Sequence, residues 1–153
     1  AISIFPREIH YMAKKELFKN SLVAAFLRSL HAFPVDRDAP GPSSLKIPLG
    51  LLKKGETVGI FPTGTRTVNN SLKQGAVTIA QMAKAPLVPV VYKGPVGLKA
   101  KNFFARETAS ITIGEPVHYH NLTGQNAKEK KEKIKEDTLE LENIFNQLEK
   151  EAT

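Results

Sequence analysis

The sequence predicts a single α/β domain built on a largely parallel sheet flanked by helices. Short apolar runs of strand length alternate with longer stretches in which apolar residues recur every three or four positions. This alternation is typical of parallel strands joined by crossover helices. The length of 153 residues suits one domain, and no repeat or linker divides the chain. We therefore expect residues 1–153 to form one unit.

Five segments have the length and composition of strands. They are residues 9–13, 32–35, 57–61, 87–92 and 110–113. The runs at 57–61 and 87–92 are almost continuously apolar, which is typical of strands buried on both faces.

Four helices are predicted, over residues 17–30, 45–54, 75–84 and 126–151. Asn20 or Ser21 is suited to begin the first helix. Gly55 is suited to end the second helix, and Pro48 makes the first turn of that second helix unfavourable. The C-terminal helix is amphipathic, with one apolar stripe and a Lys/Glu run from 128 to 137 that is most simply a solvated face. The stripe consists of Ile134, Thr138, Leu141, Phe145 and Leu148.

The charge of the chain narrows the choice of partner. There are 22 Lys and Arg against 15 Asp and Glu, and residues 1–120 hold 16 of the basic and 7 of the acidic side chains. A body this basic suits nucleic acid, an anionic membrane surface or phosphorylated small molecules, although a protein that simply carries excess lysine is an open alternative. Aromatic residues are only 7% of the chain and the basic residues are spread over many elements, so we expect no nucleic-acid partner.

Composition excludes several kinds of site. The chain has no cysteine, so a disulfide framework, a thiolate zinc site, an iron–sulfur cluster and a cysteine nucleophile are ruled out. The longest uninterrupted apolar run, residues 22–27, is far shorter than the roughly 20 residues of a membrane-spanning helix.

The most specific stretch follows the predicted strand at 57–61. A glycine there lets the backbone approach a ligand, hydroxyl and N–H groups can bind anionic oxygens, and an arginine offers a planar fork that matches phosphate. A plain strand–turn–helix connection capped by threonine is the alternative, and a nucleotide P-loop is disfavoured because its Gly-Lys-Ser/Thr ending is absent. The stretch reads Phe61-Pro62-Thr63-Gly64-Thr65-Arg66-Thr67.

Four blocks of sequence, in order and in register, resemble the bacterial 1-acyl-sn-glycerol-3-phosphate acyltransferases, also called lysophosphatidate acyltransferases. The resemblance covers about residues 5 to 120. The blocks are Met12-Ala13-Lys14-Lys15-Glu16-Leu17-Phe18, Ala32-Phe33-Pro34-Val35-Asp36-Arg37, Ile60-Phe61-Pro62-Thr63-Gly64-Thr65-Arg66 and Pro86-Leu87-Val88-Pro89-Val90.

The resemblance implies a glycerol-phosphate acyltransferase-like fold and an enzyme of phospholipid biosynthesis. Such an enzyme transfers a fatty acyl group from acyl-CoA or acyl-carrier protein to lysophosphatidate and yields phosphatidate. It implies no cofactor and no metal. It also implies a peripheral protein on the cytoplasmic face of the cell membrane, with an anionic membrane surface as a partner. A non-catalytic module of the same fold that binds anionic lipid is the alternative.

The resemblance also assigns residues to roles. Arg66 corresponds to the arginine that holds the substrate phosphate, with Arg37 and Lys15 as helpers. Thr63 stands where the family usually has Glu, which we interpret as variation within a subgroup. The remaining motif residues are Phe61, Pro62, Gly64, Thr65, Val88 and Pro89.

The catalytic residues of the family are a His and an Asp separated by four residues, in which the His is the general base and the Asp orients it. This dyad is expected upstream of the Lys15 block, where the chain has only His10 and no Asp. We therefore expect the dyad to belong to a segment before Ala1, and the 153 residues alone to be inactive or nearly so. His31 and Asp36 have the right spacing, but they overlap the second block, in which the family usually has Gly at position 31; they are weak candidates.

Two further features carry weaker signals. His118 and His120 lie two residues apart, which in a strand puts both on one face; they could suit a metal, but no third ligand is evident and a solvent-facing pair is the simpler interpretation. Residues 98–106 combine three basic residues with Phe103 and Phe104, as in an interfacial membrane contact or in a loop that packs its aromatic pair on the core.

Overall fold

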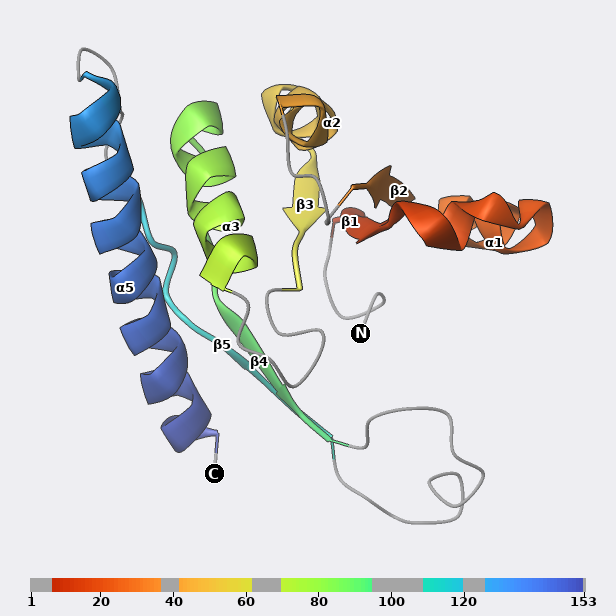
Figure 1. The fold of residues 1–153 in the computed structure, drawn as a ribbon. Coiled ribbons are helices and arrows are strands. Elements are labelled where there is room, and N and C mark those ends of the chain that lie inside the picture. Colours follow the sequence, from red (N-terminus) through yellow and green to blue (C-terminus); the bar gives the residue numbers. More distant parts are fainter. Residues whose placement is uncertain (1–6, 37–41, 62–69, 95–108, 120–125, 153) are drawn as a thin grey trace.

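The computed structural model describes residues 7–36, 42–61, 70–94, 109–119 and 126–152 (Figure 1). The elements in chain order are β1 (Ile9–Lys14), the 3₁₀ helix η2 (Lys15–Lys19), α1 (Ser21–Ser29), β2 (Ala32–Val35), α2 (Pro42–Lys53), β3 (Thr57–Gly59), α3 (Asn70–Ala83), β4 (Val90–Lys93), β5 (Ser110–Ile113) and α5 (Ala127–Glu151). Arg37, residues 62–69 with Arg66, the segment 98–106 and His120 lie outside the described residues.

A three-stranded parallel sheet in the order β2-β1-β3 is the centre of the first half of the chain. β1 pairs with β2 from Tyr11 opposite Ala32 to Lys14 opposite Val35, and with β3 through Tyr11 opposite Gly59. Both connections between these strands contain helices, as crossovers between parallel strands require. The α/β class and the parallel sheet flanked by helices are confirmed.

β4 and β5 do not extend that sheet in the part of the chain that the structure describes. They form a separate antiparallel pair, with Val90 opposite Ile113 and Lys93 opposite Ser110. The expectation of a fully buried strand at 87–92 is wrong, since Val91 is buried but Tyr92 is 50% exposed. Successive side chains of a strand point to opposite faces, and here only one face of the pair is covered.

The predicted helix at 17–30 is divided at Asn20. This residue has an extended backbone, with φ −86° and ψ 125°, which ends η2 and begins α1. Its side-chain Oδ1 accepts hydrogen bonds from the backbone N–H groups of Leu22 at 3.0 Å and Val23 at 3.3 Å. A side chain that satisfies the first free amides of a helix stabilises that helix start by about 1 kcal/mol.

α2 ends as predicted at Gly55, whose φ is +80°. The Gly55 N–H donates to the carbonyl of Leu52 at 3.0 Å, and the Glu56 N–H donates to that of Leu51 at 3.1 Å. These two bonds close the last turn around a left-handed residue. Pro48 lies inside the helix, where it is fully buried. The helix nevertheless begins earlier than predicted, at Pro42.

α3 and α5 lie side by side, and a core of buried side chains forms between them (Figure 1). Val77 of α3 and Leu141 of α5 are almost completely inaccessible. The interface also contains polar groups: Gln81 Nε2 donates to Asp137 Oδ2 at 2.5 Å, and Lys73 Nζ donates to Glu142 Oε1 at 2.8 Å. The interpretation of residues 128–137 as a solvated face is therefore wrong at Asp137, which is 2% exposed.

Candidate active site

The three parallel strands end at one edge of the sheet. Lys14, at the end of β1, pairs with Val35 at the end of β2, and β3 reaches the same edge two residues beyond Gly59. Ligands of open α/β sheets bind outside the carboxyl ends of strands. The described residues of three of the four motif blocks lie at this carboxyl edge: Lys15 follows β1, Asp36 follows β2, and Ile60 and Phe61 follow β3.

An aromatic contact fixes where the third block begins. The ring of Phe61 stacks on that of Tyr11, with centroids 5.5 Å apart and an interplanar angle of 14°. Gly59 makes room for this arrangement, since a Cβ there would lie 2.7 Å from Tyr11 Cδ1 and 2.9 Å from Ile9 Cγ2. Phe61 remains 57% exposed, so its ring covers Tyr11 on one side and faces outward on the other.

Tyr11 was missed by the sequence analysis. Its position in β1 gives no chemical signal, and the available hint was Gly59, because a glycine inside an apolar strand often marks a close approach. Burial raises the pKa of the Tyr11 phenol above its ordinary value of 10.0, and a phenol with either pKa is protonated at neutral pH. It is a neutral hydrogen-bonding group beside the edge.

Of the three cations predicted to bind phosphate, Lys15 is the one that lies among the described residues. It is the first residue of η2, directly after β1, and its side chain is exposed. Its neighbours Lys14 and Glu16 approach each other to 3.9 Å between Nζ and Oε2. The abrupt change from strand to 3₁₀ helix at this point leaves Lys15 at the carboxyl edge itself.

Asp36 marks the end of β2 at the same edge. Its backbone carbonyl accepts a hydrogen bond from Ser44 Oγ of α2 at 3.4 Å, which links the end of β2 to the helix that follows it. Arg37 is the next residue in the sequence, and Arg66 follows Phe61 by five positions.

Comparisons with known proteins agree with this geometry. The family model described as Acyltransferase matches residues 1–93, a range that contains all three blocks of the carboxyl edge. The chain is 51% identical over 152 residues to the 1-acyl-sn-glycerol-3-phosphate acyltransferase of Bacillus subtilis, covering 96% of this chain and 75% of that protein. The chain belongs to the acyltransferase family.

A second curated relative and one solved structure are also similar to this chain. The 1-acyl-sn-glycerol-3-phosphate acyltransferase of Streptococcus pneumoniae is 38% identical over 127 residues, which are 82% of this chain and 47% of that protein. The crystal structure of the 1-acyl-sn-glycerophosphate acyltransferase from Thermotoga maritima matches 92% of this chain and 56% of its own, with a TM-score of 0.50 and 22% identity. The chain thus spans about half the length of these two proteins, and the second likeness is one of fold.

His31 and Asp36 do not come together in this acyltransferase. His31 precedes β2 and Asp36 follows it, so they lie at opposite edges of the sheet. Five positions along an extended strand separate two Cα atoms by roughly 16 Å. A general base and the carboxylate that orients it must be within hydrogen-bond reach, so this pair cannot act as a dyad in this conformation.

The backbone at position 31 has a conformation that suits glycine. His31 has a φ of +58°, in the left-handed region, and its N–H donates to the Arg28 carbonyl at 2.9 Å where α1 ends. Glycine adopts that conformation without steric cost. The histidine here therefore occupies a helix-ending position rather than a catalytic one.

A second group of titratable residues lies at the opposite, amino edge of the sheet. His31 Nδ1 is 3.6 Å from Glu8 Oε2, His10 Nε2 is 3.8 Å from Glu56 Oε2, and the two imidazole rings stack with centroids 5.3 Å apart. These residues are distant in sequence and only the parallel register assembles them. They lie at the edge opposite the ends of β1 and β2, so we assign them no part in acyl transfer.

The fourth block lies outside the three-stranded sheet. Pro89 is fully buried and Val88 is 45% exposed, immediately before β4. The Pro89 carbonyl accepts from the Gly114 N–H at 2.9 Å, and a Cβ on Gly114 would lie 2.7 Å from Leu148 Cδ1 of α5. This block joins the β4–β5 pair to α5.

The remaining candidates gain no support from geometry. His118 is exposed, and within the described ranges no three His, Cys, Asp or Glu side chains are grouped so that they could hold a metal ion. Of the helices that the structure describes, none combines the length and the apolar character needed to cross a membrane.

Proposed function

We propose that the protein transfers a fatty acyl group from acyl-CoA or acyl-carrier protein to the free hydroxyl of lysophosphatidate, giving phosphatidate. The observation that supports this most is the meeting of three motif blocks at the carboxyl edge of the parallel sheet. The relatives' names supply the acceptor, a 1-acylglycerol 3-phosphate. The donor follows from the need for an activated acyl thioester.

In this proposal the carboxyl edge binds the phosphate of the acceptor. Arg66 is the main ligand, because its planar guanidinium can donate two parallel hydrogen bonds to phosphate oxygens. Arg37 and Lys15 add positive charge, and Lys15 is exposed at the start of η2 where it can reach an anion. Thr63, Gly64 and Thr65, close to Arg66 in the sequence, supply hydroxyl and amide groups.

The described residues are assigned binding and orientation, not proton transfer. His31 and Asp36 are separated by the length of β2, so neither serves as the general base or its partner. For the 153 residues expressed alone we accordingly expect little or no turnover with lysophosphatidate and an acyl thioester, since loss of a general base typically costs about 10²–10⁴-fold.

The basic body of the chain suits both remaining partners. Residues 1–120 carry 16 Lys and Arg against 7 Asp and Glu. Such an excess attracts an anionic membrane surface, and it also favours an acidic donor such as acyl-carrier protein. We propose a peripheral location at the cytoplasmic face of the cell membrane, where the lysolipid acceptor is held.

The proposal is tested by substituting Arg66 and measuring ligand binding by calorimetry. A charge-assisted pair to phosphate contributes about 1.5–3 kcal/mol, so Arg66→Ala should weaken binding of a short-chain lysophosphatidate roughly 10- to 100-fold. Arg7→Ala removes an exposed arginine outside the motif blocks and should bind as the unchanged chain does.

A second ligand separates phosphate recognition from binding of the acyl chain. A monoacylglycerol with the same acyl chain lacks the phosphate, so it should bind weakly to the unchanged chain and equally weakly to Arg66→Ala. Equal affinity of Arg66→Ala and Arg7→Ala for lysophosphatidate would refute the assignment. Binding without product formation by the natural protein would instead support the non-catalytic lipid-binding module.

A further inference from the structure

Large apolar side chains lie exposed on one side of α1. Leu22 is 80% exposed, Phe26 63% and Val23 40%. Phe26 is four positions after Leu22 and three after Val23, spacings that place side chains side by side on a helix, so these three form one continuous strip. Leu17 of η2 is 50% exposed, whereas Ala24 on the other side of α1 is buried against the molecule. We call the strip formed by Leu17, Leu22, Val23 and Phe26 the α1 face.

Exposed apolar side chains also gather on the uncovered face of the β4–β5 pair, where Val90, 37% exposed, lies opposite Ile113, 51% exposed. Among the described helices, the α1 face is the largest such group. Met82 of α3 and Leu139 of α5 are about as exposed as Leu17, but each belongs to a different helix that is otherwise polar on its outer side. Single exposed apolar residues are normal on proteins, whereas a contiguous strip usually marks a surface that docks on something.

The charges around the α1 face are almost all positive. α1 itself contains one charged residue, Arg28, whose guanidinium carbon is 5.9 Å from the centre of the Phe18 ring. η2 adds exposed cations at Lys15 and Lys19 and one acid, Glu16. Large apolar side chains bordered by lysine and arginine are the pattern of a segment that lies in the interface of an anionic bilayer.

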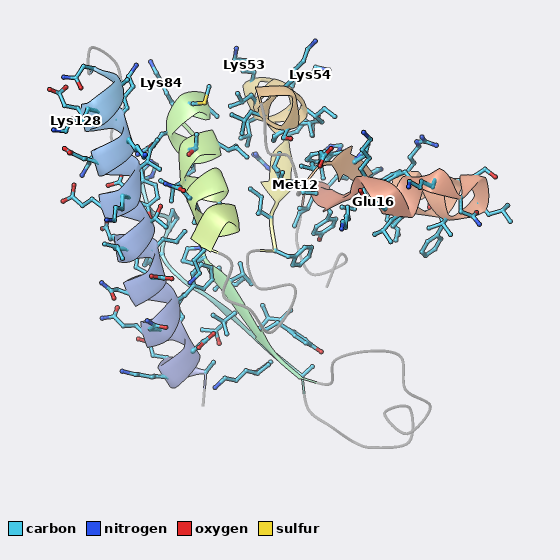
Figure 2. All side chains as sticks on the ribbon, in the orientation of Figure 1. Met12, Glu16, Lys53, Lys54, Lys84 and Lys128 are labelled. Atoms are coloured by element: carbon cyan, nitrogen blue, oxygen red, sulfur yellow. The ribbon has the colours of Figure 1, made fainter. Side chains whose placement is uncertain are left out.

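The α1 face lies next to the carboxyl edge. η2 begins at the residue after β1, so the chain passes from the edge directly into this surface. Figure 1 shows α1 projecting from the sheet on the side away from α3 and α5, and Figure 2 shows its side chains with no other element laid over them. A membrane under α1 would thus have the carboxyl edge close to its surface.

We propose that the α1 face docks on an anionic lipid bilayer. Leu22, Phe26 and their neighbours enter the interfacial layer, while Lys19 and Arg28 bind lipid phosphates. The inference rests on the proposed function in that the acceptor is a membrane lipid, and it names the surface that brings the carboxyl edge to that lipid. Lipid is favoured over a protein partner because cations border the strip and α1 carries no acid that would pair with a basic partner.

Vesicle sedimentation tests the proposal with charge-introducing variants. The double substitution Leu22→Glu with Phe26→Glu should reduce partition onto phosphatidylcholine vesicles containing phosphatidylglycerol by at least about tenfold, since two apolar side chains are lost from the interface and two like charges are added. Leu139→Glu changes a residue of α5 that is 53% exposed and should leave partition unchanged. Lys19→Gln should weaken it about fivefold, and only on the anionic vesicles.

A local probe shows which surface meets the lipid. The chain contains no cysteine, so a single introduced thiol can be labelled uniquely. A polarity-sensitive dye at Phe26→Cys should shift to shorter wavelength on anionic vesicles, whereas the same dye at Leu139→Cys should not. Equal responses at both positions, or none at Phe26→Cys, would overturn the proposal.

Further measurements distinguish docking from the proposed function and from other occupants. The double variant should still bind a short-chain lysophosphatidate below its micelle concentration, and Arg66→Ala should lose that ligand but keep the vesicles. If the α1 face instead covers a second copy or another segment of the protein, the double substitution will change the mass measured by light scattering or lower the unfolding temperature by many degrees. Either result would overturn lipid as the occupant.

Discussion

His31 occupies a backbone conformation that usually belongs to glycine. Its φ of +58° places it in the left-handed region at the end of α1, which costs a residue with a Cβ roughly 1–2 kcal/mol. Its side chain offsets part of that cost by stacking on His10 and approaching Glu8. Both side chains of the His31–Glu8 pair are well exposed, so the ion pair contributes little.

This balance predicts the behaviour of two variants. His31→Gly relieves the backbone cost and loses the weak contacts, so its unfolding temperature should stay within a few degrees of the unchanged protein. His31→Ala loses the same contacts without that relief and should be less stable by about 1 kcal/mol. Thermal unfolding followed by circular dichroism measures both.

The same variants test whether His31 acts in catalysis. Acyl transfer by the natural protein should be the same with His31→Gly as without it. A fall of two or more orders of magnitude in a correctly folded variant would show that His31 is the general base, against the geometry described above.

At the scale of elements, local signals in the sequence predicted where helices begin and end better than they predicted which side chains are buried. Asn20 and Gly55 mark a helix start and a helix end by their own side-chain and backbone chemistry, and both do so in the structure. Exposure of Tyr92 and burial of Asp137 depend on which element packs against them, which periodicity does not reveal. Asp137 belongs to a charged run whose other members face solvent, and only the position of α3 makes it an interior residue.

Tyr119 gives the packing of α5 a measurable pH dependence. Burial, together with the negative charges of Glu140 and Asp137, raises the pKa of its phenol well above the ordinary 10.0. The folded state therefore keeps a proton that the unfolded state releases as the pH rises above about 10, and the free energy of unfolding falls in that range. Stability at neutral pH is unaffected by this titration.

Tyr119→Phe should remove this part of the alkaline destabilisation. Its hydroxyl is buried without a hydrogen-bond partner among the described residues, so losing it should cost nothing at pH 7. Lys133, whose pKa is raised by its hydrogen bonds to Glu136 and Asp137, contributes in the same direction in both proteins. Urea unfolding of the pair at pH 7 and at pH 11 should therefore show a difference at pH 11 that favours Tyr119→Phe; parallel loss in both would contradict the account.

At the scale of the whole molecule, the sequence predicted parallel strands that end in the motif blocks, but it did not predict the side-chain contacts around those strand ends. Lys15, Asp36 and Phe61, each from a different block, lie far apart in the chain, and the parallel register brings the strands that precede them to one edge. The contact of Tyr11 with Phe61 and the histidine pair at the amino edge were not predictable, because they depend on side-chain packing across strands. The α1 face was also hidden, since its apolar spacing equals that of a buried helix.

The central claim is that the phosphate of lysophosphatidate binds at the carboxyl edge, and amide chemical shifts test it directly. The chain of 16.8 kDa suits two-dimensional NMR. Titration with a short-chain lysophosphatidate should move the amide signals of Lys15, Asp36 and Phe61 along one saturation curve, while those of His10 and Glu56 at the amino edge stay in place. A monoacylglycerol of equal chain length should not reproduce these shifts. Shifts gathered at the amino edge, or the same shifts with both ligands, would contradict the account.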